Sequence, residues 1–176
     1  MPPDIAKGSD GADDPESWDE AYNSKGPETK VPGLAEMLSH NPGGSKKGTG
    51  SSQSFNVVEA EGDDLVHSDG KTAQKAVELI GKYKDMEQPF FLAVGFVRPH
   101  VPLVAPKKYF APYPLGKIVL PPKIPGDQND IPRNPANKRT TANYKMDLNQ
   151  QKRVVRAYYA SVTFVDALVG LSLIHI

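Results

Sequence analysis

The chain has 176 residues with 21 Lys and Arg against 21 Asp and Glu, so its formal charge is zero and it has no net field that would attract nucleic acid or an anionic membrane. It contains no cysteine, which excludes disulfides, thiolate metal sites and cysteine nucleophiles within these residues. The length suits one domain of ordinary size, and 17 prolines with 15 glycines indicate that much of the chain forms loops.

Residues 1–62 are rich in Gly, Pro, Ser, Asp and Lys and show little apolar periodicity. This composition predicts an irregular, loop-rich segment. Two apolar groups interrupt it, Trp18 with Tyr22 and a short amphipathic turn at 34–38. We expect these groups to anchor the segment to a larger body.

The sequence offers no segment for membrane insertion or export. No stretch reaches the ~20 consecutive apolar residues that cross a bilayer, so no membrane span is predicted. The first residues lack the hydrophobic centre of a signal peptide, so the chain as written carries no export signal.

A helix is predicted over residues 70–85, because apolar residues recur there at steps of three and four and Ser68 or Asp69 is placed to cap its first turn. Residues 90–97, which follow Pro89, are continuously apolar rather than alternating. This pattern is typical of a strand that is covered on both faces, so we expect a central strand of an α/β sheet there.

Prolines dominate the region after that strand. Residues 106–110 are predicted to form one helical turn, and 115–148 a long ordered loop of the kind that shapes a site. From Asn149 an apolar stripe at helical spacing predicts a helix over 149–170. Residues 171–176 depart from this stripe and match the translation of a sequencing-library transposon end, so we expect them to be non-native adapter read-through.

His100 is the first candidate for chemistry, because Arg98-Pro99-His100 follows the predicted strand and ligands of open α/β sheets bind beyond the carboxyl ends of strands. The competing interpretation is local packing of an isolated histidine beside prolines. Arg98 has a similar alternative as an exposed cation at the end of a strand. Lys107 and Lys108 either meet an anionic substrate or face water.

The remaining polar candidates have simpler interpretations. Adjacent aspartates, Asp13-Asp14 and Asp63-Asp64, can bind a divalent ion but are usually hydrated in polar loops, so no metal site is assigned. Asp166, in the last predicted helix, is expected to be structural. His40 and His67 are expected to be solvated rather than ligands, and His175 falls in the suspected adapter segment, so none of these histidines is expected to be catalytic.

Several blocks of the sequence, in order, resemble the sulfatase family, and in particular its iduronate-2-sulfatase-like branch. The likeness spans nearly the whole chain and is weak between 23 and 62. The blocks are Asp13–Trp18, Asp69–Ala73, Gln88–Phe96, Arg98–Pro102, Pro106–Phe110, Tyr113–Leu115, Lys117-Ile118, Leu120–Pro122, Tyr158–Val162, Val165-Asp166 and Val169-Gly170.

The resemblance implies a partial alkaline-phosphatase-like α/β sandwich with one central strand, flanking helices and long Pro-rich loops, in which 63–170 belong to the central part of the catalytic domain. It implies hydrolysis of sulfate esters, for example on glycosaminoglycan or similar carbohydrate, with His100 as the catalytic histidine and Arg98 at a position where relatives vary between Lys and Arg. The candidate substrate contacts are His100, Arg98 and Lys107. It also implies a calcium ion and a formylglycine made from Cys or Ser, whose residues lie outside this chain. The implied location is periplasmic, extracellular or lysosomal.

The family's nucleophile motif, Cys/Ser-x-Pro-x-Arg, does not occur in the 176 residues. We therefore expect the chain alone to be an inactive internal fragment. Two alternatives stay open at this point: a phosphoesterase or phosphonate hydrolase of the same superfamily, and a non-catalytic binding protein that keeps the fold.

Overall fold

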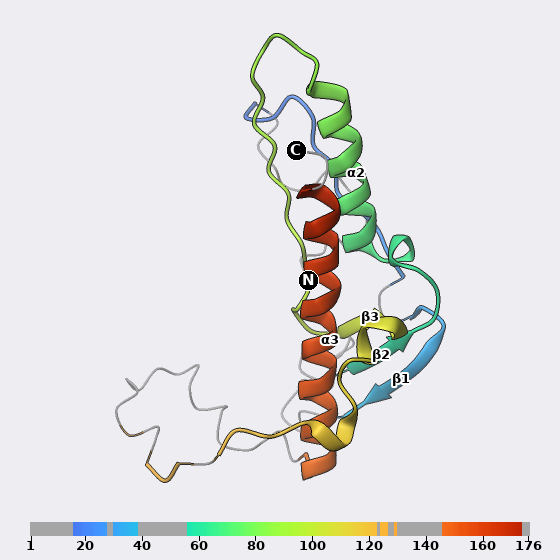
Figure 1. The fold of residues 1–176 in the computed structure, drawn as a ribbon, viewed down its shortest axis with the longest axis vertical. Helices are drawn as coiled ribbons and strands as arrows, with labels where there is room; N and C mark the ends of the chain where they lie inside the picture. Colours follow the sequence, from blue (N-terminus) through green and yellow to red (C-terminus); the bar gives the residue numbers. More distant parts are fainter. Residues whose placement is uncertain are drawn as a thin grey trace, which may run out of the picture.

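The computed structural model describes residues 16–27, 30–38, 56–122, 124–126, 129 and 146–173. They form a mixed α/β structure, which confirms the predicted class (Figure 1). The elements in chain order are β1 (Gly33–Met37), β2 (Asn56–Ala60), the 3-10 turn η2 (Asp64–Val66), α2 (Ser68–Tyr83), β3 (Leu103–Pro106), the 3-10 turns η3 (Lys107–Phe110) and η4 (Leu115–Lys117), and α3 (Leu148–Leu173).

The three strands make one sheet in the order β1-β2-β3. β1 runs antiparallel to β2, whereas β2 and β3 are parallel and are joined through α2, as a parallel pair requires a crossover connection. Gly33 opens β1 with φ +144°, and a Cβ at this position would lie 2.2 Å from the Glu59 carbonyl oxygen. Only glycine fits this approach of β1 to β2.

β1 and β2 correct the expectation that residues 1–62 are irregular. Each strand has only five residues, too few to show a periodic pattern against the polar sequence around it. β2 forms because Val57 and Val58 pair with Leu103 and Val104 of a strand far along the chain. Such a non-local cause leaves no local signal in the sequence.

Both faces of β2 and β3 are covered. On one face Val57, Leu103 and Ala105 join the main core, and on the other Val58, Ala60 and Val104 form a second cluster with Val31. This alternation follows the two-residue period of a strand. The main core is completed by the residue after β1 and by buried residues of α2, η3 and α3. These are Leu38, Ala73, Phe110, Ala157, Ala160, Phe164 and Leu168.

Helix α2 confirms the helix predicted over 70–85, but its predicted cap is wrong. The helix begins at Ser68, and His67 occupies the capping position without a side-chain cap bond. The Asp69 carboxylate instead accepts hydrogen bonds from the backbone N–H groups of Val97 and Arg98. The one-turn helix predicted at 106–110 is confirmed by η3.

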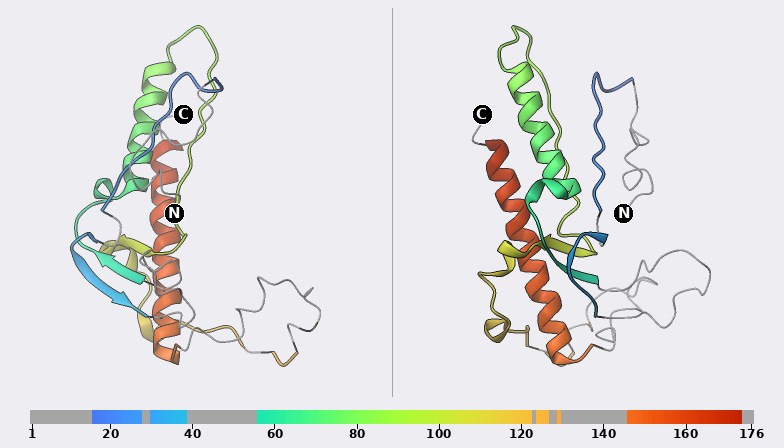
Figure 2. Two further views of the ribbon diagram at one scale, coloured as in Figure 1. Left: turned by 180° about the vertical axis from the view of Figure 1, so that it is seen from behind. Right: turned by 90° about the vertical axis from the view of Figure 1, so that its right-hand side faces the viewer.

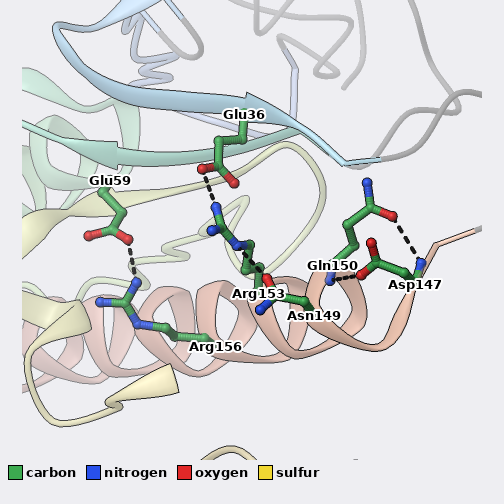
Figure 3. Close-up of polar contacts among 7 residues, drawn as sticks. All are labelled: Glu36, Glu59, Asp147, Asn149, Gln150, Arg153 and Arg156. Atoms are coloured by element: carbon green, nitrogen blue, oxygen red, sulfur yellow. Dashed lines mark hydrogen bonds and ion pairs between the residues drawn. The ribbon is translucent and has the colours of Figure 1, made fainter. Parts of the chain in front are cut away.

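Helix α3 confirms the helix predicted over 149–170 and continues to Leu173. Its start is fixed by reciprocal bonds, in which Gln150 N donates to Asp147 Oδ1 at 2.8 Å and Asp147 N donates to Gln150 Oε1 at 2.9 Å (Figure 3). This arrangement is a capping box, with Asp in place of the usual Ser or Thr.

Two ion pairs connect α3 to the sheet. Arg153 Nη1 donates to Glu36 on β1, and one turn later Arg156 Nη1 donates to Glu59 on β2 (Figure 3). The buried face of α3 packs on β3 and η3 through its first half and on α2 through its second half (Figures 1 and 2).

By length and composition, Leu148–Leu171 of α3 is also apolar enough to cross a membrane, although no such span was predicted from the sequence. A core helix of a soluble protein passes the same criterion, and the Ala157, Ala160, Phe164 and Leu168 face of α3 is buried in the core. The criterion is therefore weak support for a membrane span.

The central strand predicted at 90–97 is wrong in position. After α2 the chain turns back and runs along it in an extended path, but residues 90–97 form no strand (Figures 1 and 2). A strand needs a hydrogen-bonded neighbour, and none of the strands in the described part of the chain flanks this segment. Phe91 is 81% exposed, whereas all four residues of β3 are buried, so the doubly covered strand is β3.

Candidate functional site

The candidate histidine lies on the loop Arg98–Val101, whose start is bound to α2. Val97 N donates to Asp69 Oδ1 and Arg98 N donates to Asp69 Oδ2, both at 2.9 Å. Asp69 is in the first turn of α2 and only 3% exposed. Each carboxylate oxygen therefore holds one of two successive backbone amides in a buried, charge-assisted contact.

The Arg98 side chain is buried in the same place, with 5% exposure. Its Nε donates to the Val104 carbonyl of β3 at 3.0 Å, and its Nη1 lies 3.5 Å from the His100 carbonyl oxygen. These contacts join the guanidinium to the main chain at His100, within the loop, and at Val104, just beyond its end. Because guanidinium has only donors, backbone carbonyls are suitable partners for it in a buried place.

His100 is exposed, and its backbone N donates to the Val97 carbonyl at 3.0 Å. Its Nδ1 lies 2.5 Å from the Val101 carbonyl oxygen. A carbonyl oxygen can only accept, so Nδ1 carries the proton and Nε2 is the nitrogen left for a ligand. The peptide bonds Arg98–Pro99 and Val101–Pro102 are both cis.

The position of His100 differs from the one the sequence predicted. His100 precedes β3 and so lies toward the amino end of that strand, not beyond the carboxyl end of a strand over 90–97. The argument from the carboxyl ends of strands therefore does not apply to it within this sheet. What nominates His100 in the structure is its exposure together with the fixed Nδ1.

Lys107 lies at the opposite end of β3 from His100. It follows the carboxyl end of that strand, and its Nζ is 3.5 Å from Glu61 Oε1, which follows the carboxyl end of the parallel β2. Both side chains are more than half exposed, so this ion pair contributes little to the stability of the fold. The structure brings Arg98 and His100 together and leaves Lys107 apart from them.

Next to Lys107, Lys108 and Tyr109 contact the same carboxylate. Lys108 Nζ lies 2.9 Å from Asp64 Oδ1, and Tyr109 Oη donates to Asp64 Oδ2 at 2.7 Å. The hydrogen bond to Asp64 raises the pKa of Lys108, and burial raises the pKa of Tyr109, with the Asp64 bond adding to the effect. Lys108 is therefore engaged with Asp64, whereas Lys107 is the more exposed of the two lysines.

A separate cleft of about 420 Å³ lies between residues 18–24, α2 and residues 91–97. Trp18 stacks on Phe91 across it with ring centroids 6.0 Å apart, and Lys75 lies 5.8 Å from the Tyr22 ring. These contacts confirm that Trp18 and Tyr22 anchor their segment. The cleft lining includes Asp69 but not His100.

Among the residues that the structure describes, no group of three or more His, Cys, Asp or Glu side chains is placed to hold a metal ion. Asp63 Oδ1 accepts from Leu65 N at 3.0 Å as the cap of η2, and the Asp64 carboxylate is paired with Lys108 and Tyr109. His67, expected to be solvated, is instead buried, and its ring makes an edge-to-face contact with Phe164, 5.6 Å between centroids. The pair Asp13-Asp14, His40 and His175 lie outside the described residues.

Sequence reasoning missed the role of Asp69, which it interpreted as a helix cap. The contacts of its carboxylate come from residues 28 and 29 positions later, so nothing near Asp69 in the sequence indicates them. The one available signal was the requirement that the amides of a loop entering a buried region find acceptors.

Comparison with known proteins matches residues 16–173 to the family model described as Sulfatase. A sulfatase of Formosa agariphila is 42% identical over 92 residues, covering 49% of this chain and 18% of the relative. Human iduronate 2-sulfatase is 30% identical over 115 residues, covering 58% and 21%, and an arylsulfatase of Clostridium perfringens is 32% identical over 118 residues, covering 62% and 22%. The chain thus spans about a fifth of the length of these curated relatives. Because the family model covers most of its residues, the chain belongs to the sulfatase family.

Proposed function

We propose that this chain is an internal segment of a longer sulfatase that hydrolyses sulfate esters of carbohydrates. The family match over 16–173 supports the reaction class, and the short span relative to the curated relatives supports the segment interpretation. The carbohydrate assignment rests on the relative named iduronate 2-sulfatase, since iduronate is a sugar acid. On this proposal, the segment alone has no sulfatase activity.

His100 is the proposed catalytic residue, and the geometry of its ring carries the proposal. Nδ1 is bound to the Val101 carbonyl oxygen, so the ring orientation is set and Nε2 is the nitrogen that meets the substrate. A protonated imidazole there can contact a sulfate oxygen, or donate its proton to the alcohol oxygen as the sulfur–oxygen bond breaks. General acid catalysis of this kind contributes about a hundredfold or more.

Calcium and formylglycine are the cofactors that the family implies, and the residues described here do not fit either one. No cluster of acidic or histidine side chains is placed to bind an ion among them, and the whole sequence has no cysteine and no Cys/Ser-x-Pro-x-Arg motif. We propose that residues of the longer protein, outside these 176, provide both groups.

Arg98 and Lys107 are proposed to contribute to substrate binding in different ways, Arg98 indirectly and Lys107 directly. The guanidinium of Arg98 is bonded to the carbonyls of Val104 and His100, so any effect on the substrate passes through the shape of the loop. Lys107 is exposed and only weakly paired with Glu61, so its ammonium is the one that can turn toward an anionic group on the substrate.

The test of the function is hydrolysis of an aryl sulfate by the longer protein and by its His100→Ala variant. We expect kcat/KM to fall about a hundredfold with an unchanged melting temperature, because His100 is exposed and removing a proton donor acts on the transition state. Near-normal turnover of the variant would contradict the role of His100. Faster hydrolysis of the matching aryl phosphate than of the sulfate by the wild-type protein would contradict the sulfatase assignment itself.

A further inference from the structure

We propose that Asp69 is a positioning residue for His100, acting through the backbone of the Arg98–Val101 loop. The inference rests on the proposed role of His100 in sulfate-ester hydrolysis and adds a residue from a different element to that site. Asp69 touches neither the imidazole nor a substrate in this arrangement. Its effect is carried by the two amides that it binds.

The first step of the argument is the contact itself. A carboxylate with two hydrogen bonds of 2.9 Å, one from Val97 N to Oδ1 and one from Arg98 N to Oδ2, fixes the place and the orientation of two successive peptide units. Asp69 is 3% exposed, so water is poorly placed to take over if the carboxylate is removed. Two buried amides would then lose their acceptors.

The second step is the rigidity of the element that carries Asp69. It lies in the first turn of α2, where the positive end of the helix dipole favours a carboxylate. The next residue, Gly70, packs so closely that a Cβ would come within 1.8 Å of the Asp64 carbonyl oxygen. The first turn of α2 therefore has no room to move toward η2, and the carboxylate is held in a defined place.

The third step connects the bound amides to the imidazole. His100 N donates to the Val97 carbonyl, and the Arg98 guanidinium binds the carbonyl of Val104 and lies 3.5 Å from that of His100. The short loop is thus held by Asp69 at its beginning and by the Arg98 side chain toward its end, at His100 and Val104. A displacement of about 1 Å in a catalytic group can cost on the order of a hundredfold in rate, so loosening this loop is expected to reach the chemistry.

The decisive experiment is a double-mutant cycle in the longer sulfatase with an aryl sulfate as substrate. We expect Asp69→Asn to lower kcat at least about tenfold with little change in KM, because the amide keeps the size of the side chain but places NH2 against one backbone N–H. In the His100→Ala background the same change should cost less than about twofold, since its effect passes through the missing imidazole. Asp69→Glu, which keeps two acceptor oxygens, should recover part of the loss.

The cycle separates the two proposals. An equal loss of kcat from Asp69→Asn in both backgrounds would overturn the positioning role and leave the catalytic role of His100 intact. If His100→Ala alone leaves kcat unchanged, His100 is not catalytic, and Asp69 then has no catalytic residue to position. Glu78→Gln, an exposed carboxylate change on the same helix, is the matched control and should leave kcat unchanged.

Amide hydrogen exchange tests the contact without reference to activity. In the 176-residue chain we expect Asp69→Asn to speed exchange of the Val97 or Arg98 amide about tenfold or more, while the amides paired between β2 and β3 keep their rates. Unchanged exchange at both amides would show that the carboxylate does not hold the loop, and would overturn the inference even if the kinetic result were as expected.

Discussion

Arg156 on α3 donates from Nη1 to the carboxylate of Glu59 on β2 (Figure 3). The same guanidinium donates from Nε to the Tyr113 carbonyl at 2.8 Å and lies 5.1 Å from the centre of the Phe110 ring. The Arg156 and Glu59 side chains are 23% and 18% exposed. One arginine thus connects the long helix, the central strand of the sheet and the segment that follows β3.

We expect Arg156→Ala to lower the free energy of unfolding by about 2 kcal/mol, because it leaves a largely buried carboxylate and a carbonyl without their donor. Arg153→Ala is the control, since Arg153 is 40% exposed, and should cost under about 1 kcal/mol. Urea unfolding of the chain and both variants measures the difference. Equal losses would show that burial of the Arg156 pair is not what matters.

Two glycines of α2 should respond in opposite directions to the same change. A Cβ at Gly70 would lie 1.8 Å from the Asp64 carbonyl oxygen, whereas a Cβ at Gly81 would meet nothing within 4 Å. We expect Gly70→Ala to destabilise the chain by more than about 2 kcal/mol through this clash, and Gly81→Ala to stabilise it by roughly 0.5–1 kcal/mol through helix propensity. Thermal unfolding checks both, and a stable Gly70→Ala variant would show that η2 can move away from α2.

Glu20 should make the attachment of residues 16–24 sensitive to acid. Its hydrogen bonds from Lys82, Lys75 and Tyr83 lower the pKa of the carboxyl from 4.5 to about 2. A lowered pKa means that the contact contributes fully above pH 4.5 and is lost as the pH falls toward 2. Trp18, the single tryptophan, lies two residues before Glu20 and stacks on Phe91, so its fluorescence should change in that interval.

The comparison variant for this acid response is Glu20→Gln, which should remove most of the fluorescence change between pH 4.5 and 2. Asp19→Asn, at its exposed neighbour, should keep the change. The same transition in both variants and in the wild-type chain would mean that other carboxyl groups release the segment.

The helices were predictable because their causes are local. The stripes of α2 and α3 and the proline before η3 lie within the elements that they specify, and α2, η3 and α3 formed close to the expected bounds. The sheet was not predictable, since β2 depends on β3, more than forty residues later. The apolar run 90–97 had the composition of a central strand, but composition cannot provide neighbours to pair with.

The site shows the same division. The sequence and its family likeness singled out Arg98 and His100, and the structure puts both in one loop. The sequence could not show that Arg98 would bond to backbone carbonyls or that Asp69 would hold the loop. Nor could it show that Lys107 would lie at the other end of β3. The first two depend on contacts between side chain and backbone, and the third depends on where β3 pairs with β2, and only the folded chain creates these arrangements.

The partly exposed apolar segment 90–97 should cause the 176-residue chain to self-associate. Phe91 is 81% exposed and lies among Phe90 and Val94, which are also exposed, so the segment presents adjacent apolar groups to water. We expect Phe91→Asp to increase the monomeric fraction several-fold, as measured by size-exclusion chromatography with light scattering. Val119→Asp is the matched control, because Val119 is 82% exposed but lies outside this segment, and it should leave the monomeric fraction nearly unchanged. If both variants became equally monomeric, the added negative charge rather than the segment would govern association. If neither variant became more monomeric, another surface would be responsible.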